Sequence, residues 1–82
     1  MGHTVYILYS NSIKKYYAGQ TGNLVNRLKE HNSGETKSIR HGCPWELMWH
    51  AEVSNRSEAM VLEERIKKRG ITRFLRDIDC VV

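Results

Sequence analysis

The 82-residue sequence predicts an α+β domain, with a small three-stranded antiparallel sheet flanked by helices in the order ββαβαα. Three short runs alternate between the two faces of a chain with the period of two that is typical of strands. Two longer segments carry apolar residues at helical spacing, and a glycine closes each of them. We expect one domain, 1–82, because a chain of this length has room for a single small core.

The first two predicted strands each carry a tyrosine. The run Val5–Tyr9 is β-branched and aromatic, and Tyr6 lies on one of its two faces. A second strand, Tyr16–Thr21, contains Tyr17. Because the link 10–15 between the strands is short and polar, we expect an antiparallel hairpin in which the two tyrosines can be neighbours.

The helix predicted next has ionisable residues on its apolar side. In the segment 23–31, the spacing i, i+3, i+4, i+7 of a core-facing stripe is occupied by Leu24, Arg27, Leu28 and His31. Arg27 and His31 lie four residues apart, so they are stacked on one helix face at the edge of the apolar side. The sequence Asn32-Ser33-Gly34 then ends the helix.

A long connection, Asn32–Pro44, leads to the third predicted strand. The connection is rich in helix breakers, and a turn of helix can form around Thr36–Arg40. The strand is predicted at Trp45–Val53. Its alternation places one set of side chains toward the core: Trp45, Leu47, Trp49 and Ala51.

The second long helix is predicted to begin after Asn55, which forms a capping box with Glu58, and to end at Gly70. Its core-facing stripe consists of Ala59, Leu62, Glu63 and Ile66. Glu63 is therefore a carboxylate at a position where an apolar residue is expected. A last short helix follows, with Thr72 as its cap; Phe74, Leu75 and Ile78 close the core, and Arg73 and Arg76 stay outside.

The composition suits a cytoplasmic protein whose basic residues either bind a polyanion or form an ordinary solvated helix surface. Thirteen basic against nine acidic residues give a net charge of +4, and six of the bases lie in the segment 65–76. Cys43 and Cys80 are expected to be free thiols, because two distant cysteines do not make a disulfide scaffold. Their spacing from the histidines does not predict a structural zinc site. No signal peptide, myristoylation motif or membrane-spanning apolar run is found, so we expect no membrane association.

Four motifs together resemble the GIY-YIG nuclease superfamily, and most closely its small stand-alone members. They are Val5-Tyr6-Ile7-Leu8, Tyr17-Ala18-Gly19, Arg27-Leu28-Lys29-Glu30-His31-Asn32, and Ser57-Glu58-Ala59 leading to Glu63 and Ile66-Lys67-Lys68. The resemblance covers nearly the whole chain. The first motif here is Thr4-Val5-Tyr6, and the second has alanine where the superfamily has isoleucine. Both keep the tyrosine, and the second keeps Gly19 as a backbone requirement.

The resemblance implies hydrolysis of a nucleic-acid phosphodiester with one divalent ion, Mg²⁺ or Mn²⁺, bound weakly without substrate. Glu63 would bind the metal, and Arg27 would contact the scissile phosphate, where its fork geometry suits the charge that develops. For the base we prefer Tyr6, whose phenolate the nearby Arg27 and metal would favour. His31 is the other candidate base, here given an orienting role, and Tyr17 would donate a hydrogen bond to the phosphate.

Each of these residues also has an ordinary structural interpretation. Tyrosines suit half-buried strand positions, and Gly19 suits a bulge or a close approach. Arg27 could extend from the edge of the core, and His31 could interact with a helix C-terminus. Glu63 could pair with Lys67, four residues further on.

The leading hypothesis is a nuclease that acts in DNA repair or processing, on DNA rather than RNA. The second is a catalytically weak or inactive nucleic-acid-binding module, which binds through counterion release by basic residues of the segment 65–76. Those residues are Arg65, Lys67, Lys68, Arg69 and Arg73. The third is a structural adaptor. Target choice is expected to come from nucleic-acid shape, a recruiting protein partner or self-association.

Overall fold

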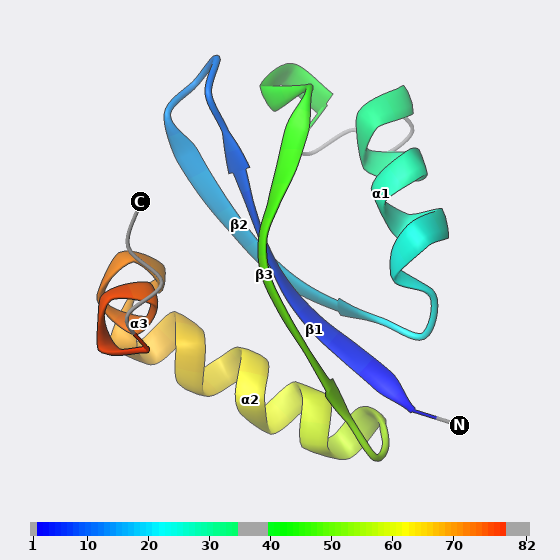
Figure 1. Ribbon diagram of the computed structural model, residues 1–82, viewed down its shortest axis with the longest axis vertical. Helices are drawn as coiled ribbons and strands as arrows, with labels where there is room; N and C mark the ends of the chain where they lie inside the picture. Colours follow the sequence, from blue (N-terminus) through cyan, green and yellow to red (C-terminus); the bar gives the residue numbers. More distant parts are fainter. Residues whose placement is uncertain (1, 35–39, 79–82) are drawn as a thin grey trace.

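The computed structural model describes residues 2–34 and 40–78, and within them it has the predicted order of elements. The strands are β1 His3–Ser10, β2 Lys15–Thr21 and β3 Trp45–Val53. The helices are α1 Leu24–Ser33, α2 Arg56–Arg69 and α3 Ile71–Asp77, and a 3-10 turn, η1, spans Arg40–Gly42. The α+β class and the order ββαβαα are therefore confirmed (Figure 1).

The sheet has the strand order β2-β1-β3, and both neighbouring pairs are antiparallel. The hairpin predicted from the short polar link joins β1 to β2 through residues 11–14. Hydrogen bonds close its turn: the Ile13 N–H donates to Ser10 Oγ at 3.3 Å, and the Lys14 ammonium donates to Asn11 Oδ1 at 2.7 Å. Strand β1 is thus central and pairs along both of its edges.

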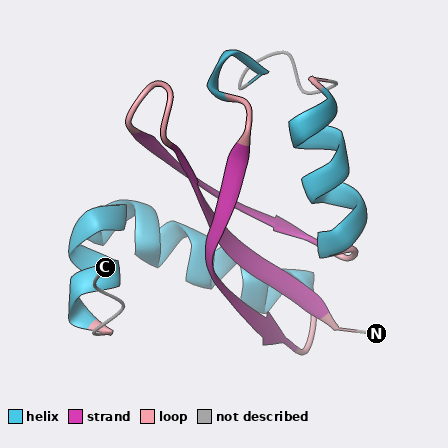
Figure 2. Cartoon of the chain, turned by 45° about the horizontal axis from the view of Figure 1, so that its top comes forward, coloured by secondary structure: helices cyan, strands magenta, loops and turns pink. Residues whose placement is uncertain are grey.

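The sheet lies between two layers of helix, with α1 over one face and α2 and α3 over the other (Figures 1 and 2). The buried core on the side of α2 and α3 consists of Val5, Ile7, Ala18, Ala59, Ile66 and Leu75. The buried core on the side of α1 consists of Tyr6, Leu8 and Trp45. Alternate residues of β1 therefore enter different cores, and those facing α1 are enclosed between sheet and helix.

An asparagine side chain begins each of the two long helices, and the cap at Asn55 was predicted. Asn23 Oδ1 accepts the N–H of Asn26 at 3.1 Å and so caps α1. Asn55 Oδ1 accepts the N–H of Glu58 at 2.9 Å, and the Glu58 carboxylate in turn accepts the N–H of Ser54 at 3.0 Å. These bonds satisfy N–H groups that have no partner within the helix, which fixes where α1 and α2 begin.

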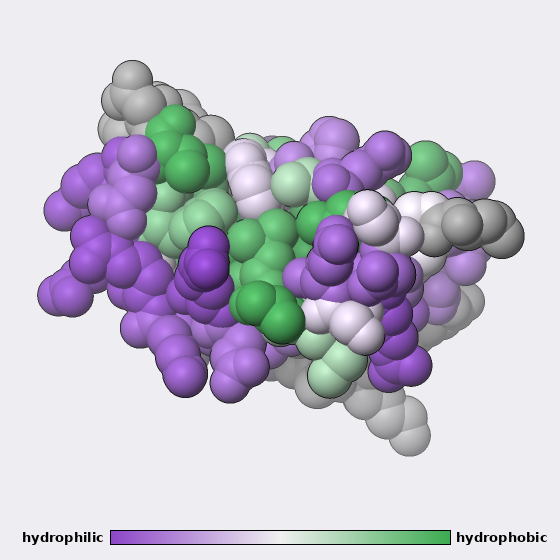
Figure 3. All heavy atoms as spheres, turned by 90° about the horizontal axis from the view of Figure 1, so that it is seen from below, coloured by the Kyte–Doolittle hydropathy of each residue, from purple (hydrophilic) through white to green (hydrophobic). Residues whose placement is uncertain are grey.

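The outer face of α2 is not uniformly polar. Met60 and Val61 expose 52% and 61% of their surface. Figure 3 views the molecule from below, the side on which α2 lies, and shows apolar side chains between hydrophilic ones. We call this pair, Met60 and Val61, the α2 apolar strip.

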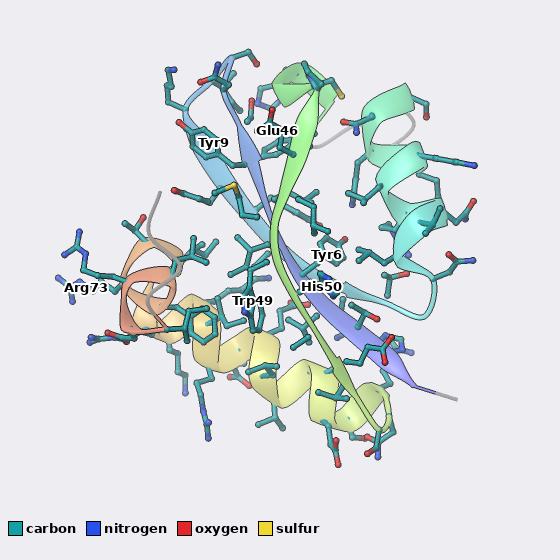
Figure 4. The ribbon with its side chains drawn as sticks, viewed as in Figure 1. Tyr6, Tyr9, Glu46, Trp49, His50 and Arg73 are labelled. Carbon is teal, nitrogen blue, oxygen red and sulfur yellow. The ribbon has the colours of Figure 1, made fainter. Side chains whose placement is uncertain are left out.

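A bulge in β3 changes which of its residues enter the core. The register with β1 shifts at Met48, the extra residue. Trp45, before the bulge, packs on the side of α1, whereas Trp49, after it, packs toward α2 and α3 (Figure 4). Leu47 stays 38% exposed. The prediction that these residues share one core-facing side is wrong, because one inserted residue reverses the facing of everything beyond it.

The last helix also differs from the prediction. Gly70, with φ of 94°, ends α2 and is the residue from which α3 begins. Thr72 lies inside α3 and does not cap it, because the helix already starts one residue earlier without a side-chain cap. Phe74 and Leu75 pack into the core as predicted, but Ile78 is 40% exposed and does not.

Part of the connection before β3 lies outside the described residues. The helical turn predicted around Thr36–Arg40 falls there except for Arg40, where η1 begins. Cys43 is a free thiol, and its Sγ donates a hydrogen bond to the carbonyl of His31 at 2.9 Å. Cys80 is also outside the described residues, so its expected free thiol stays a prediction.

Candidate active site

Tyr6 reaches toward α1 across a glycine. It lies on the central strand directly opposite Gly19 of β2. A Cβ on Gly19 would lie 2.6 Å from Tyr6 Oη and 2.8 Å from its Cζ, so no larger residue fits beneath the phenol. Of the interpretations open from the sequence, Gly19 is a close-approach glycine, and it lets the Tyr6 ring lie against the sheet.

We expect Gly19→Ala to lower the free energy of unfolding by roughly 1–3 kcal/mol, because the added methyl group displaces the buried Tyr6 ring. Urea unfolding monitored by tryptophan fluorescence measures this loss. Gly22→Ala is the matched control, since a Cβ there would lie no nearer than 3.8 Å to the ring of His3. Equal losses in the two variants would contradict a specific clash with Tyr6.

His31 forms a buried hydrogen bond with Tyr6. Helix α1 directs the imidazole at the phenol, with 3.0 Å between Tyr6 Oη and His31 Nε2. The two residues are only 2% and 1% exposed. Tyr17 lies on the same face of the sheet, with its ring centroid 6.4 Å from that of Tyr6 and 5.5 Å from that of His31. The predicted proximity of the two tyrosines is confirmed, and the three rings form one cluster.

The surroundings keep both members of this hydrogen-bonded pair neutral. Burial raises the pKa of the Tyr6 phenol well above its usual value; Tyr17 acts in the same direction, and Arg27 opposes it. Burial lowers the pKa of His31, Arg27 lowers it further, and Glu30 opposes this. Arg27 lowers the pKa of Tyr6, as expected, but without metal or substrate the effect of burial is larger. At neutral pH the phenol keeps its proton and the imidazole is uncharged.

Arg27 lies beside the tyrosine–histidine pair with an unused hydrogen-bond donor. Its side chain is half-buried on α1, one helical turn before His31, which matches the predicted edge position. Its Nε is buried and makes no hydrogen bond to any described residue. A buried N–H without an acceptor is costly, so this donor is suited to an oxygen of a ligand. The planar guanidinium fits phosphate oxygens in particular.

Glu63 acts on the same phenol from α2, which packs against β2. Its charge contributes to the raised pKa of Tyr6, so the carboxylate is within electrostatic reach of the site. The Glu63 side chain is 20% exposed, and its Oε2 accepts the Lys67 ammonium at 2.9 Å. The ion pair with Lys67, which was the structural alternative for Glu63, is therefore present. This pair occupies Oε2 of Glu63 and leaves its Oε1 without a hydrogen bond to the described residues.

The donors present fit a weakly held Mg²⁺ or Mn²⁺ ion. Within residues 2–34 and 40–78, no group of three or more His, Cys, Asp or Glu side chains could hold a metal. Mg²⁺ needs fewer protein ligands than this, because it keeps several waters and takes other ligands from substrate phosphate. A single carboxylate such as Glu63, partly exposed and with one oxygen available, is a sufficient protein ligand of this kind.

The five predicted nucleic-acid-binding residues lie on the exposed surface of α2 and α3. They are Arg65, Lys67, Lys68, Arg69 and Arg73. Three of them already pair with carboxylates of these helices, at 2.9 Å for Lys67, 4.0 Å for Lys68 and 2.7 Å for Arg69. Arg65 and Arg73 make no ion pair with any described residue, and Arg73 extends outward from α3 (Figure 4). The role of all five in binding nucleic acid stays a prediction.

Two basic side chains that the sequence analysis did not single out converge on Arg27. They line a hollow of about 250 Å³ whose walls are His3, Gln20, Thr21, Gly22, Arg27 and Arg56. The start of β1 and the end of β2 meet at this edge because the hairpin is antiparallel. The strand register could have predicted that His3 lies near Gln20 and Thr21, whereas Arg56 joins them only through the packing of α2.

Comparison with known proteins identifies the family. The model of the GIY-YIG catalytic domain matches residues 2–73, which contain every residue of the site described above. The chain belongs to the GIY-YIG family. It is 40% identical over 67 residues to the UPF0213 protein OB0043 of Oceanobacillus iheyensis, an alignment that covers 80% of this chain and 77% of that protein.

A solved structure also has a similar fold. The solution NMR structure of the UPF0213 protein BH0048 from Bacillus halodurans superposes with a TM-score of 0.59 at 29% identity. The match covers 96% of this chain and 84% of the other.

Membership makes this GIY-YIG domain part of a family of nucleases, for which nucleic acid is the substrate class and divalent metals are the usual cofactors. The resemblance predicted from the motifs is thereby confirmed. In the part of the chain that the structure describes, no helix is long and apolar enough to cross a membrane.

Proposed function

We propose that this GIY-YIG domain is a divalent-metal-dependent endonuclease that hydrolyses nucleic-acid phosphodiester bonds. The observation that carries the proposal is the buried hydrogen bond of 3.0 Å between Tyr6 Oη and His31 Nε2, in a site whose charges come from Arg27 and Glu63. The site thus offers groups for proton transfer, phosphate binding and metal binding. Metal-assisted hydrolysis of a phosphodiester requires all three.

Arg27 would bind the scissile phosphate. Its buried Nε lacks an acceptor among the described residues, and a non-bridging phosphate oxygen supplies one. Negative charge grows on these oxygens as the water attacks, so a guanidinium fixed in a partly dry site stabilises the transition state more than the ground state. Tyr17, on the same face of the sheet, would donate a hydrogen bond from its hydroxyl to the same phosphate.

Tyr6 and His31 would form the path for the proton of the attacking water. Tyr6 Oη takes this proton as its own proton passes to His31 Nε2, so a free phenolate, which burial disfavours, does not have to form. His31 is uncharged before the reaction and ends it as an imidazolium. The substrate phosphate offsets the charge of Arg27, which otherwise helps to keep the pKa of His31 low.

Glu63 would hold the single Mg²⁺ or Mn²⁺ ion. When bound, the ion supplies positive charge at the phosphate and lowers the pKa of the water that attacks it. Lys67 competes for one oxygen of Glu63 at 2.9 Å, and no second carboxylate assists, so the affinity without substrate is expected to be low.

A cleavage panel tests the proposal. Labelled single-stranded, duplex and flap DNA, with matched RNA, are incubated with the wild-type protein and with Arg27→Ala in Mg²⁺ or Mn²⁺. We expect the wild type to cut at least one substrate, and we expect Arg27→Ala to be slower by about 100- to 1,000-fold, the usual cost of losing one transition-state donor. No cleavage of any substrate by the wild type would overturn the proposal.

The matched RNA substrates in this panel also test the choice between DNA and RNA. We propose DNA rather than RNA as the substrate, and DNA repair or processing as the role. We also place the activity in the cytoplasm, which the free thiol of Cys43 supports because reducing compartments preserve such thiols.

A nucleic-acid-binding module with little or no catalysis is the second candidate. It is favoured by Arg65 and Arg73, which carry charges that no described carboxylate neutralises. It is opposed by the three basic residues of α2 that already form ion pairs.

The α2 apolar strip, Met60 and Val61, is a surface through which a recruited protein or a second copy could supply target choice.

A further inference from the structure

The hollow that contains Arg27 is a basic site in its own right. Two guanidinium groups and one imidazole line it, and no carboxylate is among its lining residues. Neither Arg27 nor Arg56 forms an ion pair with any other described residue. We propose that His3 and Arg56, together with Arg27, form a second phosphate site, which binds the nucleic-acid backbone at a phosphate next to the scissile one.

Unpartnered buried atoms indicate that the hollow is built for a ligand. Arg27 Nε and Gln20 Oε1 are both buried, and neither makes a hydrogen bond to the residues that the structure describes. Buried polar atoms are costly unless a partner reaches them. Because Arg27 Nε is proposed to meet the scissile phosphate, the terminal NH₂ groups of its guanidinium are the donors for the second phosphate. A half-turn of the Gln20 amide presents its NH₂ group to another oxygen of that second phosphate.

Local structure fixes the floor of the hollow. Thr21 Oγ1 accepts the N–H of Asn23 at 3.1 Å, which ties the end of β2 to the cap of α1. The ring of His3 lies against Gly22, where a Cβ would be 3.8 Å from its Nδ1. The antiparallel pairing of β1 with β2 therefore holds His3 and Gln20 at one edge, so little ordering is needed on binding.

The size and position of the hollow favour a phosphate of a strand over a whole nucleotide. Its volume of about 250 Å³ lies below the range of roughly 300–1,000 Å³ that is typical of small-molecule pockets. Arg27 belongs both to the hollow and to the site around Tyr6. A strand whose scissile phosphate meets Arg27 at the Tyr6 side therefore continues over Arg56. This choice of ligand rests on the proposed nuclease function.

Binding of small phosphates tests the site directly. Backbone amide shifts of wild-type protein are followed by NMR in metal-free buffer as thymidylyl-thymidine or inorganic phosphate is added. We expect shifts at Gln20, Thr21 and Gly22, and roughly tenfold weaker binding of thymidylyl-thymidine in Arg56→Gln. Arg76→Gln is the matched control, because it removes the same charge from the exposed surface of α3. Unshifted amides, or equal effects in the two variants, would overturn the proposal.

The salt dependence of strand binding tests whether the phosphate belongs to a nucleic acid. With a single-stranded oligonucleotide in metal-free buffer, Arg56→Gln should reduce the slope of log K against log salt by about 0.7, one phosphate contact, while Arg76→Gln leaves the slope unchanged. An unchanged slope in Arg56→Gln, with inorganic phosphate still bound, would mean a site for free anions only and would reject the proposal.

The outcome is separable from that of the nuclease proposal. Phosphate-dependent shifts and a lower slope in Arg56→Gln, in a protein that cleaves no substrate, support the second phosphate site and reject the nuclease. Cleavage of a strand at wild-type rate and affinity by Arg56→Gln supports the nuclease and rejects the second phosphate site.

Discussion

Replacing Glu63 with glutamine should abolish strand cleavage while leaving nucleic-acid binding intact in metal-free buffer. Glutamine has the same size, but its neutral amide is a poor ligand for Mg²⁺. Losing several kcal/mol of charge stabilisation at the phosphate corresponds to a rate lower by about 1,000-fold or more. Single-turnover cleavage of a labelled oligonucleotide measures the rate, and fluorescence anisotropy without metal measures binding.

The fold should tolerate this change, so the loss of activity can be attributed to the site. Glu63 is 20% exposed, and its i,i+4 pair with Lys67 contributes less than about 1 kcal/mol to stability. Glu64→Gln is the matched control, because it removes the same charge one residue further on, where the side chain is 72% exposed. A Glu63→Gln variant that still cuts, or a Glu64→Gln variant equally impaired, would remove the metal-binding role from Glu63.

Local signals were sufficient to predict most of the fold. The cap at Asn55 and the glycines at 34 and 70 mark helix ends through hydrogen bonds within a few residues, so they were predicted from the sequence. The bulge at Met48 could not be predicted, because it depends on how β3 pairs with β1. The start of α3 was missed since Gly70 serves two helices, and the side-chain cap expected from Thr72 is not needed.

The candidate site was predictable where its residues break a periodic pattern. Arg27, His31 and Glu63 replace apolar residues on helical stripes; His31 bonds to Tyr6, and the charges of Arg27 and Glu63 act on the pKa of its phenol. The dominance of burial over the charge of Arg27 in setting the pKa of Tyr6 was not predictable, because it depends on how closely α1 covers the sheet. Arg56 was missed for a related reason: its position beside Arg27 arises only from the tertiary fold.

Acid should destabilise the fold through His31. Burial and Arg27 lower its pKa in the folded chain below the value of 6.5 that it has when unfolded, and Glu30 opposes this. Between the folded pKa and about pH 6.5, the unfolded state therefore binds more protons at His31 than the folded state does. The contribution of His31 to the free energy of unfolding is fully present above about pH 6.5 and is lost as the pH falls through the folded pKa. Tyr6, the hydrogen-bond partner of the ring, keeps its proton throughout this range because burial raises its pKa.

The free energy of unfolding, measured by urea titration from pH 7.5 down to pH 4.5, should therefore fall more steeply in wild type than in His31→Gln. His50→Gln is the matched control for the loss of an imidazole, because His50 is exposed on β3. An identical decline in His31→Gln and wild type would refute the assignment to His31.

Tyr6→Phe tests the same hydrogen bond from its other end. The variant keeps the ring over Gly19 but leaves His31 Nε2 buried without its partner, beside an Nδ1 that already has none among the described residues. We expect a loss of about 1–3 kcal/mol in the free energy of unfolding at pH 7.5. The double variant Tyr6→Phe with His31→Phe keeps neither hydrogen-bonding group. Its loss in the free energy of unfolding should therefore be smaller than the sum of the losses in the two single variants. Additive losses would show that the hydrogen bond between Tyr6 and His31 does not stabilise the fold.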